Sequence, residues 1–280
     1  MTTYAFRIVN VFTIGADKFS GNPLCVFEDA RDLTDAQMQQ LARQMNLSET
    51  TFVLPSDVAD ARVRIFTPGF EMPFAGHPTL GTASVIAAGR ATLALEMRAG
   101  IVAVTAAEGV YTLRTARAPT TRPVEATRDE LARMVDLPSG AVADEPLWVD
   151  TGVEQLVIPV ASAELVRAAK PVPALLERWG YSATRQEAMA YLFAPASDAF
   201  LVRFFFTSHG AVIEDPATGS ACANLGGWMI ARGLPRPFAT TLWQGEAVGR
   251  PSRLDLLVEA DGGIFVAGAV LELGRGTVTL

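Results

Sequence analysis

The sequence predicts an α+β protein of two related halves, in each of which a mostly antiparallel sheet surrounds one central helix. A motif of the form X-Pro-x-x-Gly-[Ser/Thr]-Ala occurs at residues 77–83 and again at residues 215–221. The segment Arg64-Ile65-Phe66-Thr67, upstream of the first copy, is echoed by Arg203-Phe204-Phe205-Phe206. Each half also contains many short strand patterns and one small, apolar helix pattern. A repeat near half the chain length indicates an internal duplication.

The first half begins with a predicted hairpin. Residues 6–12 alternate as a strand, Gly21-Asn22-Pro23 forms a turn, and residues 24–27 form the second strand. Thr34 can cap a helix that runs to about Asn46. Further strands are expected at residues 48–54, 62–67, 92–97, 102–106 and 110–115. Residues 79–88 predict a buried helix, with Pro78 in its first turn and Gly89 at its end.

The second half repeats this plan after a linker at residues 119–123. The predicted domains are therefore residues 1–118 and 119–280. Residues 147–152 open the second domain, and strands are expected at residues 156–160, 188–195, 199–206, 254–259, 263–268 and 270–273. Helices are expected at residues 165–169 and 173–179. A second buried helix is expected at residues 217–231, closed by Gly233.

Composition narrows the class of protein. The chain has 280 residues, of which 50% are hydrophobic, and a net charge of −7, so nothing indicates the basic face of a nucleic-acid-binding protein. It contains no apolar run of the roughly 18 residues that a membrane-spanning helix needs, and its start lacks the pattern of a secretory signal. Cys25 and Cys222 lie in apolar contexts, which fits a reducing cytoplasm. We therefore expect a cytoplasmic protein that binds neither nucleic acid nor membrane.

The two copies of the motif predict a binding site. Both helices are expected to begin at Pro, preceded by a polar residue that is His77 in one copy and Asp215 in the other. Helix N-termini leave backbone N–H groups without partners, and Gly81 or Gly219 at the third helical position would let a ligand approach the backbone. Two such termini facing each other suit a carboxylate or a developing oxyanion. The alternative is that Pro-x-x-Gly only starts a helix, which Asp215 caps.

Two further residues are candidates for acid–base chemistry. His77 stands beside a helix start, where the dipole disfavours the protonated ring, so it would be neutral near pH 7. Glu49 lies between a helix end and an apolar strand. It is either solvated at the rim, which the residues alone favour, or partly desolvated and able to take and return a proton.

The sequence does not indicate a zinc site, a nucleotide-binding loop or a nucleophilic serine. His209 reads as part of a surface turn, and two histidines without paired cysteines do not suggest zinc. The Gly226-Gly227 and Gly262-Gly263 pairs lack the spacing of a nucleotide-binding loop, and no serine stands in a nucleophile elbow. We therefore expect no metal and no cofactor.

The motifs taken together resemble the PhzF-like isomerase family of phenazine biosynthesis. The segments that carry the resemblance run in the family's order from end to end: Phe19-Ser20-Gly21-Asn22-Pro23, Asn46-Leu47-Ser48-Glu49-Thr50, Ala75-Gly76-His77-Pro78-Thr79, residues 214–221 and Gly249-Arg250-Pro251-Ser252. The resemblance implies the diaminopimelate-epimerase-like fold. In this fold, two pseudo-symmetric domains each form a barrel-like sheet around a central helix, and the active site lies in the cleft between them. It also implies a homodimer, and a C-terminal strand at about 270–280 that returns to the first domain.

The resemblance further implies the roles of individual residues. Glu49 would be the general acid/base that moves a proton between ring carbons of a substrate like trans-2,3-dihydro-3-hydroxyanthranilate, without a cofactor. His77, Asp215 and Ser220 would bind and polarise its amino, hydroxyl and carboxylate groups. Backbone N–H groups at Gly76, Gly219 and Ser220 would hold the carboxylate or delocalised charge, and Gln244 would be a further contact.

The chain departs from the family pattern at two places. Cys222 stands where the family commonly has His, and Cys25 where it commonly has Ala. Neither cysteine lies at a helix start, so a racemase that uses two thiols is disfavoured. Two alternatives to the isomerase stay open. One is an epimerase that uses Glu49 with His77 or Asp215, and the other is a binding protein that kept the site without the chemistry.

Overall fold

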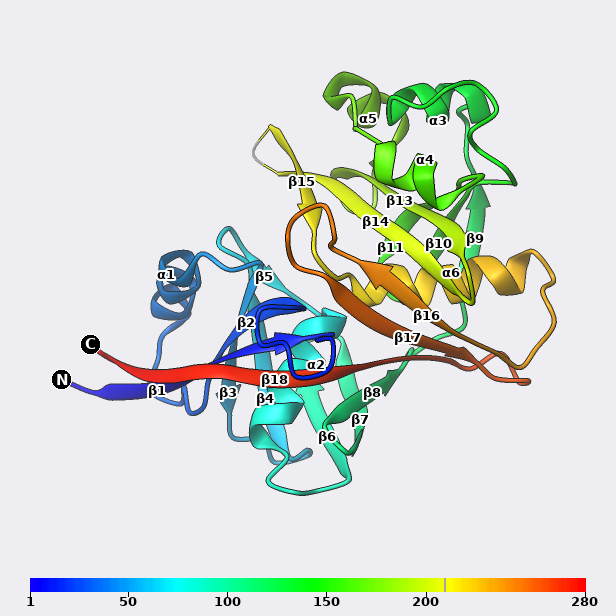
Figure 1. Ribbon diagram of the computed structural model, residues 1–280. Coiled ribbons are helices and arrows are strands. Elements are labelled where there is room, and N and C mark those ends of the chain that lie inside the picture. The colour runs from blue at the N-terminus through cyan, green and yellow to red at the C-terminus, as the bar shows by residue number, and fades with distance from the viewer. Residues whose placement is uncertain (209) are drawn as a thin grey trace. The chain divides into compact units, whose positions relative to one another are not determined.

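The computed structural model describes residues 1–208 and 210–280, and the chain folds into two units. The first unit contains Met1–Arg114 together with Ala267–Leu280, and the second contains Thr115–Val266. Each unit combines strands with one long apolar helix, which confirms the predicted α+β class (Figure 1). In the described part of the chain, no helix is long and apolar enough to cross a membrane.

Eight strands of the first unit close into a barrel. The elements are β1 (Thr3–Val11), β2 (Asn22–Phe27), α1 (Asp35–Met45), β3 (Glu49–Leu54), β4 (Ala61–Phe66), β5 (Glu71–Met72), α2 (Gly76–Ile86), β6 (Thr92–Met97), β7 (Gly100–Ala107), β8 (Val110–Arg114) and β18 (Ile264–Thr279). The pairings run β1–β2–β3–β4–β6–β7–β8–β18 and return to β1, with β2–β3 and β4–β6 parallel. Helix α2 contacts β1, β2, β3, β6, β7 and β8, so it fills the barrel.

The strands of the second unit pair in the same order along the chain, again with two parallel pairs. Its elements are β9 (Thr120–Pro123), α3 (Arg128–Met134), β10 (Leu147–Asp150), β11 (Glu154–Pro159), α4 (Ala163–Ala168), α5 (Pro173–Trp179), β12 (Tyr181–Ser182), β13 (Glu187–Ala196), β14 (Ala199–Ser208), β15 (Ala211–Asp215), α6 (Gly219–Ala231), β16 (Phe238–Gln244) and β17 (Ser252–Val258). The pairings run β9–β10–β11–β13–β14–β16–β17, with β11–β13 and β14–β16 parallel. Helix α6 contacts β9, β10, β11 and β17.

The duplication extends to individual ion pairs. Arg64 on β4 binds Glu71 on β5 through Nε and Nη2, at 2.7 and 2.8 Å. Arg203 on β14 binds Glu214 on β15 in the same bidentate way, at 2.9 and 2.7 Å. Each arginine also lies over the phenylalanine two residues later, Phe66 or Phe205. Each pair thus joins the strand to the short hairpin that leads toward the central helix.

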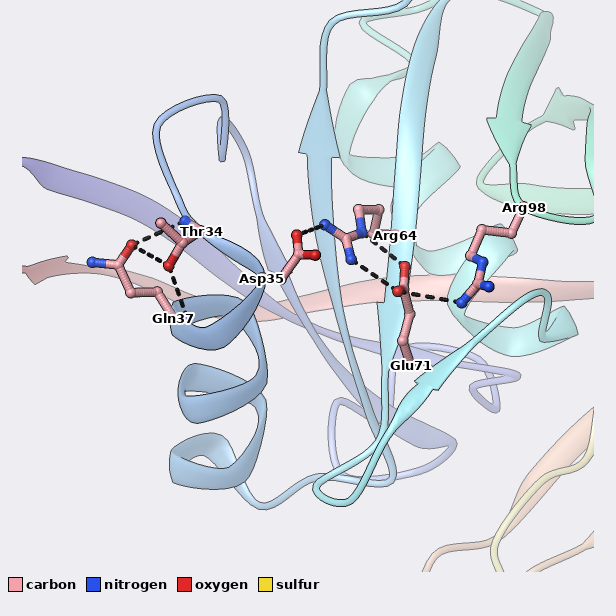
Figure 2. A network of polar contacts seen from close by, with 6 residues as sticks. All are labelled: Thr34, Asp35, Gln37, Arg64, Glu71 and Arg98. Carbon is pink, nitrogen blue, oxygen red and sulfur yellow. Dashed lines mark hydrogen bonds and ion pairs between the residues drawn. The ribbon is translucent and has the colours of Figure 1, made fainter.

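In the first unit this ion pair is part of a wider network (Figure 2). Arg64 also binds Asp35 at the first turn of α1, and Glu71 accepts a further bond from Arg98. Thr34 and Gln37 form a capping box, and Asn46 ends the helix in the left-handed conformation at φ 52°. The helix predicted from Thr34 to about Asn46 is therefore confirmed, and the network connects its N-terminus to β4.

The prediction that both central helices begin at Pro is wrong. Helix α2 begins at Gly76, before Pro78, whereas α6 begins at Gly219, after Pro216. Gly81 is consequently an interior residue of α2. A Cβ atom there would lie 2.5 Å from Leu24 Cδ2 and 2.9 Å from Val11 Cγ2. This glycine therefore lets the helix pack closely on the barrel wall, rather than letting a ligand approach the backbone as predicted.

Candidate active site

Glu49 and His77 meet inside the first unit. Glu49 begins β3, which pairs in parallel with β2, and its position in the register is opposite Leu24. Further along β3, Phe52 is fully buried and stacks on Phe27 with ring centroids 5.0 Å apart, which anchors the strand. The Glu49 side chain is 16% exposed and His77 is 5% exposed, and Glu49 Oε2 lies 3.2 Å from His77 Nδ1. Glu49 is therefore partly buried, which is the second of the two alternatives considered for it.

The second nitrogen of the His77 ring determines how the first can bond. His77 Nε2 lies 3.3 Å from the carbonyl oxygen of Pro23, which can only accept a hydrogen bond. In the neutral ring the hydrogen is therefore on Nε2, and Nδ1, the atom close to Glu49, carries none. Burial lowers the pKa of His77 to about 4, so the neutral ring prevails near pH 7.

The contact of Glu49 Oε2 with Nδ1 is close, but it does not have the geometry of a hydrogen bond. Nδ1 of the neutral ring is an acceptor, so it can take a hydrogen bond from Glu49 only when that carboxyl group is protonated. A partly buried carboxyl group beside such an acceptor is suited to hold and release a proton, which is the requirement for a general acid/base.

A second group of polar residues surrounds the start of α6. The hydroxyl of Thr218 donates to Asp215 Oδ2 at 2.6 Å. The Gln244 side chain, which is 2% exposed, donates to the Asp215 carbonyl at 2.9 Å and to Thr218 Oγ1 at 3.0 Å. Its Oε1 accepts from the backbone N–H of Thr218 at 3.2 Å. Gln244 thus holds the segment between Asp215 and the helix in place, whatever contact it makes with a substrate.

Ser220 lies in the first turn of α6, where its Oγ is 2.9 Å from Nε2 of Gln155 on β11. Sequence reasoning did not find Gln155 or Thr218 as contributors to the site. The position of Thr218 gave a usable signal, because it lies inside the second copy of the motif where the first copy has Leu80. Gln155 gave none, because one glutamine in an apolar strand is not distinctive.

The N-termini of α2 and α6 lack the side-chain caps that α1, α3 and α4 carry. Neither has a side-chain hydrogen bond at its N-cap, whereas α1 and α3 both begin with a capping box. Gly76 and Gly219 are the first residues of the two helices, so their N–H groups have no acceptor within the helix. Such groups favour a negatively charged oxygen. Their contact with substrate stays a prediction.

Metal and thiol chemistry gain no support from the described residues. Across residues 1–208 and 210–280, no cluster of three or more His, Cys, Asp or Glu side chains could hold a metal ion. His209 lies outside the described residues. Cys25 and Cys222 are fully buried, and burial raises the pKa of both thiols, that of Cys25 to about 12. Neither is available as a thiolate near pH 7.

Comparisons with known proteins point to one family over nearly the whole chain. The family model for "Phenazine biosynthesis-like protein" (PhzC-PhzF) matches residues 9–269. An uncharacterised isomerase of Pasteurella multocida is 39% identical over 285 residues, which cover 99% of this chain and 94% of that protein. The trans-2,3-dihydro-3-hydroxyanthranilate isomerase of Pseudomonas aeruginosa is 34% identical, with 91% of each chain covered.

Solved structures show the same fold. A PhzF-family protein of Bacillus anthracis superposes with a TM-score of 0.86 over 100% of both chains, at 24% identity. A predicted epimerase of Pseudomonas aeruginosa gives a TM-score of 0.81 over 99% of both chains, at 29% identity. A probable proline racemase of Agrobacterium radiobacter gives 0.64 at 13% identity, over 99% of this chain and 93% of that one, and shows the fold alone. The predicted fold class is confirmed, and the chain belongs to the PhzC/PhzF phenazine-biosynthesis-like family, as an isomerase of the PhzF type.

Proposed function

We propose that this protein moves a proton between carbons of a small, carboxylate-bearing substrate, with Glu49 as the general acid/base and without a cofactor. The observation that carries the proposal is the contact of 3.2 Å between Glu49 Oε2 and Nδ1 of the buried His77. In the reaction, the Glu49 carboxylate takes a proton from one carbon while the electron pair of the C–H bond moves into the adjacent π system. Glu49 then returns the proton to another carbon, so that a double bond has migrated and no atom is gained or lost.

His77 is suited to the protonated state of Glu49. Its Nε2 stays on the Pro23 carbonyl, so the ring keeps its orientation, and Nδ1 of the neutral ring can accept from the carboxyl when Glu49 carries the proton taken from the substrate.

The polar groups of the second unit would bind the substrate. The Asp215 carboxylate suits an amino or hydroxyl donor. The Ser220 side chain and the N–H groups of Gly219 and Ser220 suit a carboxylate oxygen, and so does the N–H group of Gly76 in the first unit. The substrate named for relatives at 34–35% identity, trans-2,3-dihydro-3-hydroxyanthranilate, carries all of these groups and is the first compound to test. The homodimer and the cytoplasmic location stay predictions.

The test is proton NMR in D2O with trans-2,3-dihydro-3-hydroxyanthranilate, comparing the wild type with Glu49→Gln. The amide of Gln can donate to His77 Nδ1, so this change keeps the local contact while removing the exchangeable carboxyl proton. We expect double-bond migration in the wild type and none in Glu49→Gln. The matched control is Glu96→Gln, at a partly buried glutamate of the same unit that bonds to Ser56, and it should retain turnover.

Turnover by Glu49→Gln would remove Glu49 from the mechanism. Deuterium at a stereocentre with the double bonds unmoved would favour the epimerase. Binding without any proton exchange would favour a protein that has lost the chemistry.

A further inference from the structure

We infer that Gln155 is a positioning residue: together with Asn224 it turns the Ser220 hydroxyl so that its proton is offered to the ligand. The group that binds at Ser220 is then a hydrogen-bond acceptor, such as a carboxylate or carbonyl oxygen, and not an ammonium group. This inference rests on the proposed function for one point, that Ser220 faces the substrate. Everything else in it comes from a chain of hydrogen bonds within the second unit.

The chain of hydrogen bonds starts at backbone groups that cannot change roles. Asn224 Oδ1 accepts from the backbone N–H of Thr151 at 2.9 Å and from the Thr151 hydroxyl at 2.7 Å. Asn224 Nδ2 donates to the carbonyl oxygen of Val153 at 2.8 Å. A backbone N–H only donates and a carbonyl oxygen only accepts, so the Asn224 amide has a single possible orientation.

That orientation passes to Gln155. The second hydrogen on Asn224 Nδ2 points to Gln155 Oε1, at 2.7 Å. Gln155 must therefore present its Nε2 to Ser220 Oγ, at 2.9 Å. Since an amide nitrogen only donates, the Ser220 oxygen is the acceptor in this bond, and its own hydrogen points elsewhere. For the described residues, the bond from Gln155 is the one hydrogen bond that the structure gives to this side chain.

The fold itself does not require these buried amides. Gln155 is 2% exposed and Asn224 is fully buried, so both lose solvation on folding. In the related helix α2, Ile86 stands at the position that matches Asn224, counted from the shared motif glycine. Thr82 stands at the position of Ser220, and its bond of 2.8 Å to Thr51 allows either oxygen to donate. Only the second unit fixes the direction of the hydroxyl.

The direction of the hydroxyl matches its surroundings. Ser220 lies at the uncapped N-terminus of α6, where the helix dipole and the backbone N–H groups favour a negatively charged oxygen. An additional O–H donor at the same place reinforces that preference. An ammonium group of a ligand can only donate, and it would face two kinds of donor, the Ser220 O–H and the backbone N–H groups of α6.

The experiment is a double-mutant cycle with Gln155→Glu and Ser220→Ala, measured as the binding of 2-aminobenzoate (anthranilate) by calorimetry. In Gln155→Glu the carboxylate would accept from Ser220, so the hydroxyl proton turns away from the ligand. We expect binding about 10- to 100-fold weaker in Gln155→Glu, and no further loss when this change is added to Ser220→Ala. A loss of equal size in both backgrounds, no loss in the wild-type background, or no binding of 2-aminobenzoate by the wild type would overturn the inference.

A second probe separates hydroxyl direction from charge repulsion. The ketone 2-aminoacetophenone is neutral and keeps the acceptor oxygen, so Gln155→Glu should still weaken its binding several-fold. An unchanged affinity would attribute the effect on 2-aminobenzoate to the added charge and overturn the inference. None of these measurements needs turnover. Failure of the isomerase reaction with the binding cycle intact would therefore remove the proposed function alone.

Neutron diffraction from deuterium-exchanged wild-type crystals tests the same point if the variants do not fold. We expect two deuterium atoms on Gln155 Nε2, one of them directed at Ser220 Oγ, and the Ser220 deuterium directed away from Gln155. A Ser220 deuterium that lies between the two side chains would overturn the inference.

Discussion

Replacing Gly81 with alanine tests whether the glycine of the repeated motif serves the core or the ligand. The structure places Gly81 in the interior of α2, against β1 and β2. A Cβ atom would lie 2.5 Å from Leu24 Cδ2, 2.9 Å from Val11 Cγ2 and 3.3 Å from Val9 Cγ2. Ordinary carbon contacts are about 3.5–4 Å, so the Leu24 methyl must move by about 1 Å. Leu24 and Val11 are both fully buried, which leaves little room for this movement.

Two effects of opposite sign decide the magnitude. Overpacking a buried site costs about 1–3 kcal/mol, whereas alanine in a helix interior is favoured over glycine by about 1 kcal/mol. We expect Gly81→Ala to lower the free energy of unfolding by about 1–2 kcal/mol. The matched control is Gly226→Ala in α6, where the three nearest side-chain atoms would lie 3.1–3.2 Å away. A shift of a few tenths of an ångström relieves these contacts, so the control should change stability by less than about 0.5 kcal/mol.

The assay must report on the first unit. All four tryptophans, Trp148, Trp179, Trp228 and Trp243, lie in the second unit, so their fluorescence is not a suitable probe. We would measure thermal unfolding by calorimetry, where the loss corresponds to a decrease in Tm of about 2–8 °C. Undiminished stability together with lost isomerase turnover would refute the reasoning, because the glycine would then serve the ligand.

Three further predictions follow from buried groups. Glu71→Gln removes the bidentate partner of Arg64, whose side chain is 14% exposed. It should lower the free energy of unfolding, measured by chemical denaturation, by about 2–4 kcal/mol. Replacing both residues by apolar ones should restore part of that stability. The pKa of His77 in the fold, about 4, lies below its ordinary value of 6.5. The neutral, buried ring therefore contributes up to about 3 kcal/mol to the free energy of unfolding, which is fully present above pH 6.5 and lost as the pH falls through 4. A plot of Tm against pH should be flatter for His77→Gln than for the wild type. Cys25 and Cys222 should not react with a thiol reagent at pH 8 until urea unfolds the protein, and a fast reaction of the native state would contradict their burial.

The sequence predicted most elements correctly where the evidence is local. The repeated motif, the alternating strands and the Thr34 cap all act over a few residues. Helix α3 was missed although Thr127 and Glu130 give the signature of a capping box in the sequence. Strand β16 was also missed, and its residues do not alternate between apolar and polar.

Other differences have tertiary causes. Helix α6 starts after the predicted point because Gln244, from a distant strand, holds both the Asp215 carbonyl and the Thr218 N–H outside the helix. The two strands predicted at residues 263–268 and 270–273 are one strand, β18. Gly268 does not interrupt it, because the space of the missing side chain is taken by the ring of Phe12. No pattern along the chain reports such contacts.

The site was predictable only in part for the same reason. His77 and Asp215 could be found because they begin the two copies of the motif. The contact between Glu49 and His77 depends on the register of β2 and β3 and on the Pro23 carbonyl, so it required the structure. The bond that orients Ser220, in helix α6, comes from Gln155 on strand β11.

The strand that closes the barrel of the first unit is synthesised last, so the barrel stays open while the chain is being translated. Its last strand is β18, which pairs with β1 from Thr279 opposite Thr3 to Val270 opposite Val11, and the two chain ends lie side by side (Figure 1). The ribosome completes residues 1–114 and then adds the roughly 150 residues of the second unit before Ala267–Leu280 can emerge. At typical synthesis rates this takes about 8–30 s. Throughout that interval the edges of β1 and β8 have no partner, so the nascent first unit is open to strand addition by other chains until the final segment arrives.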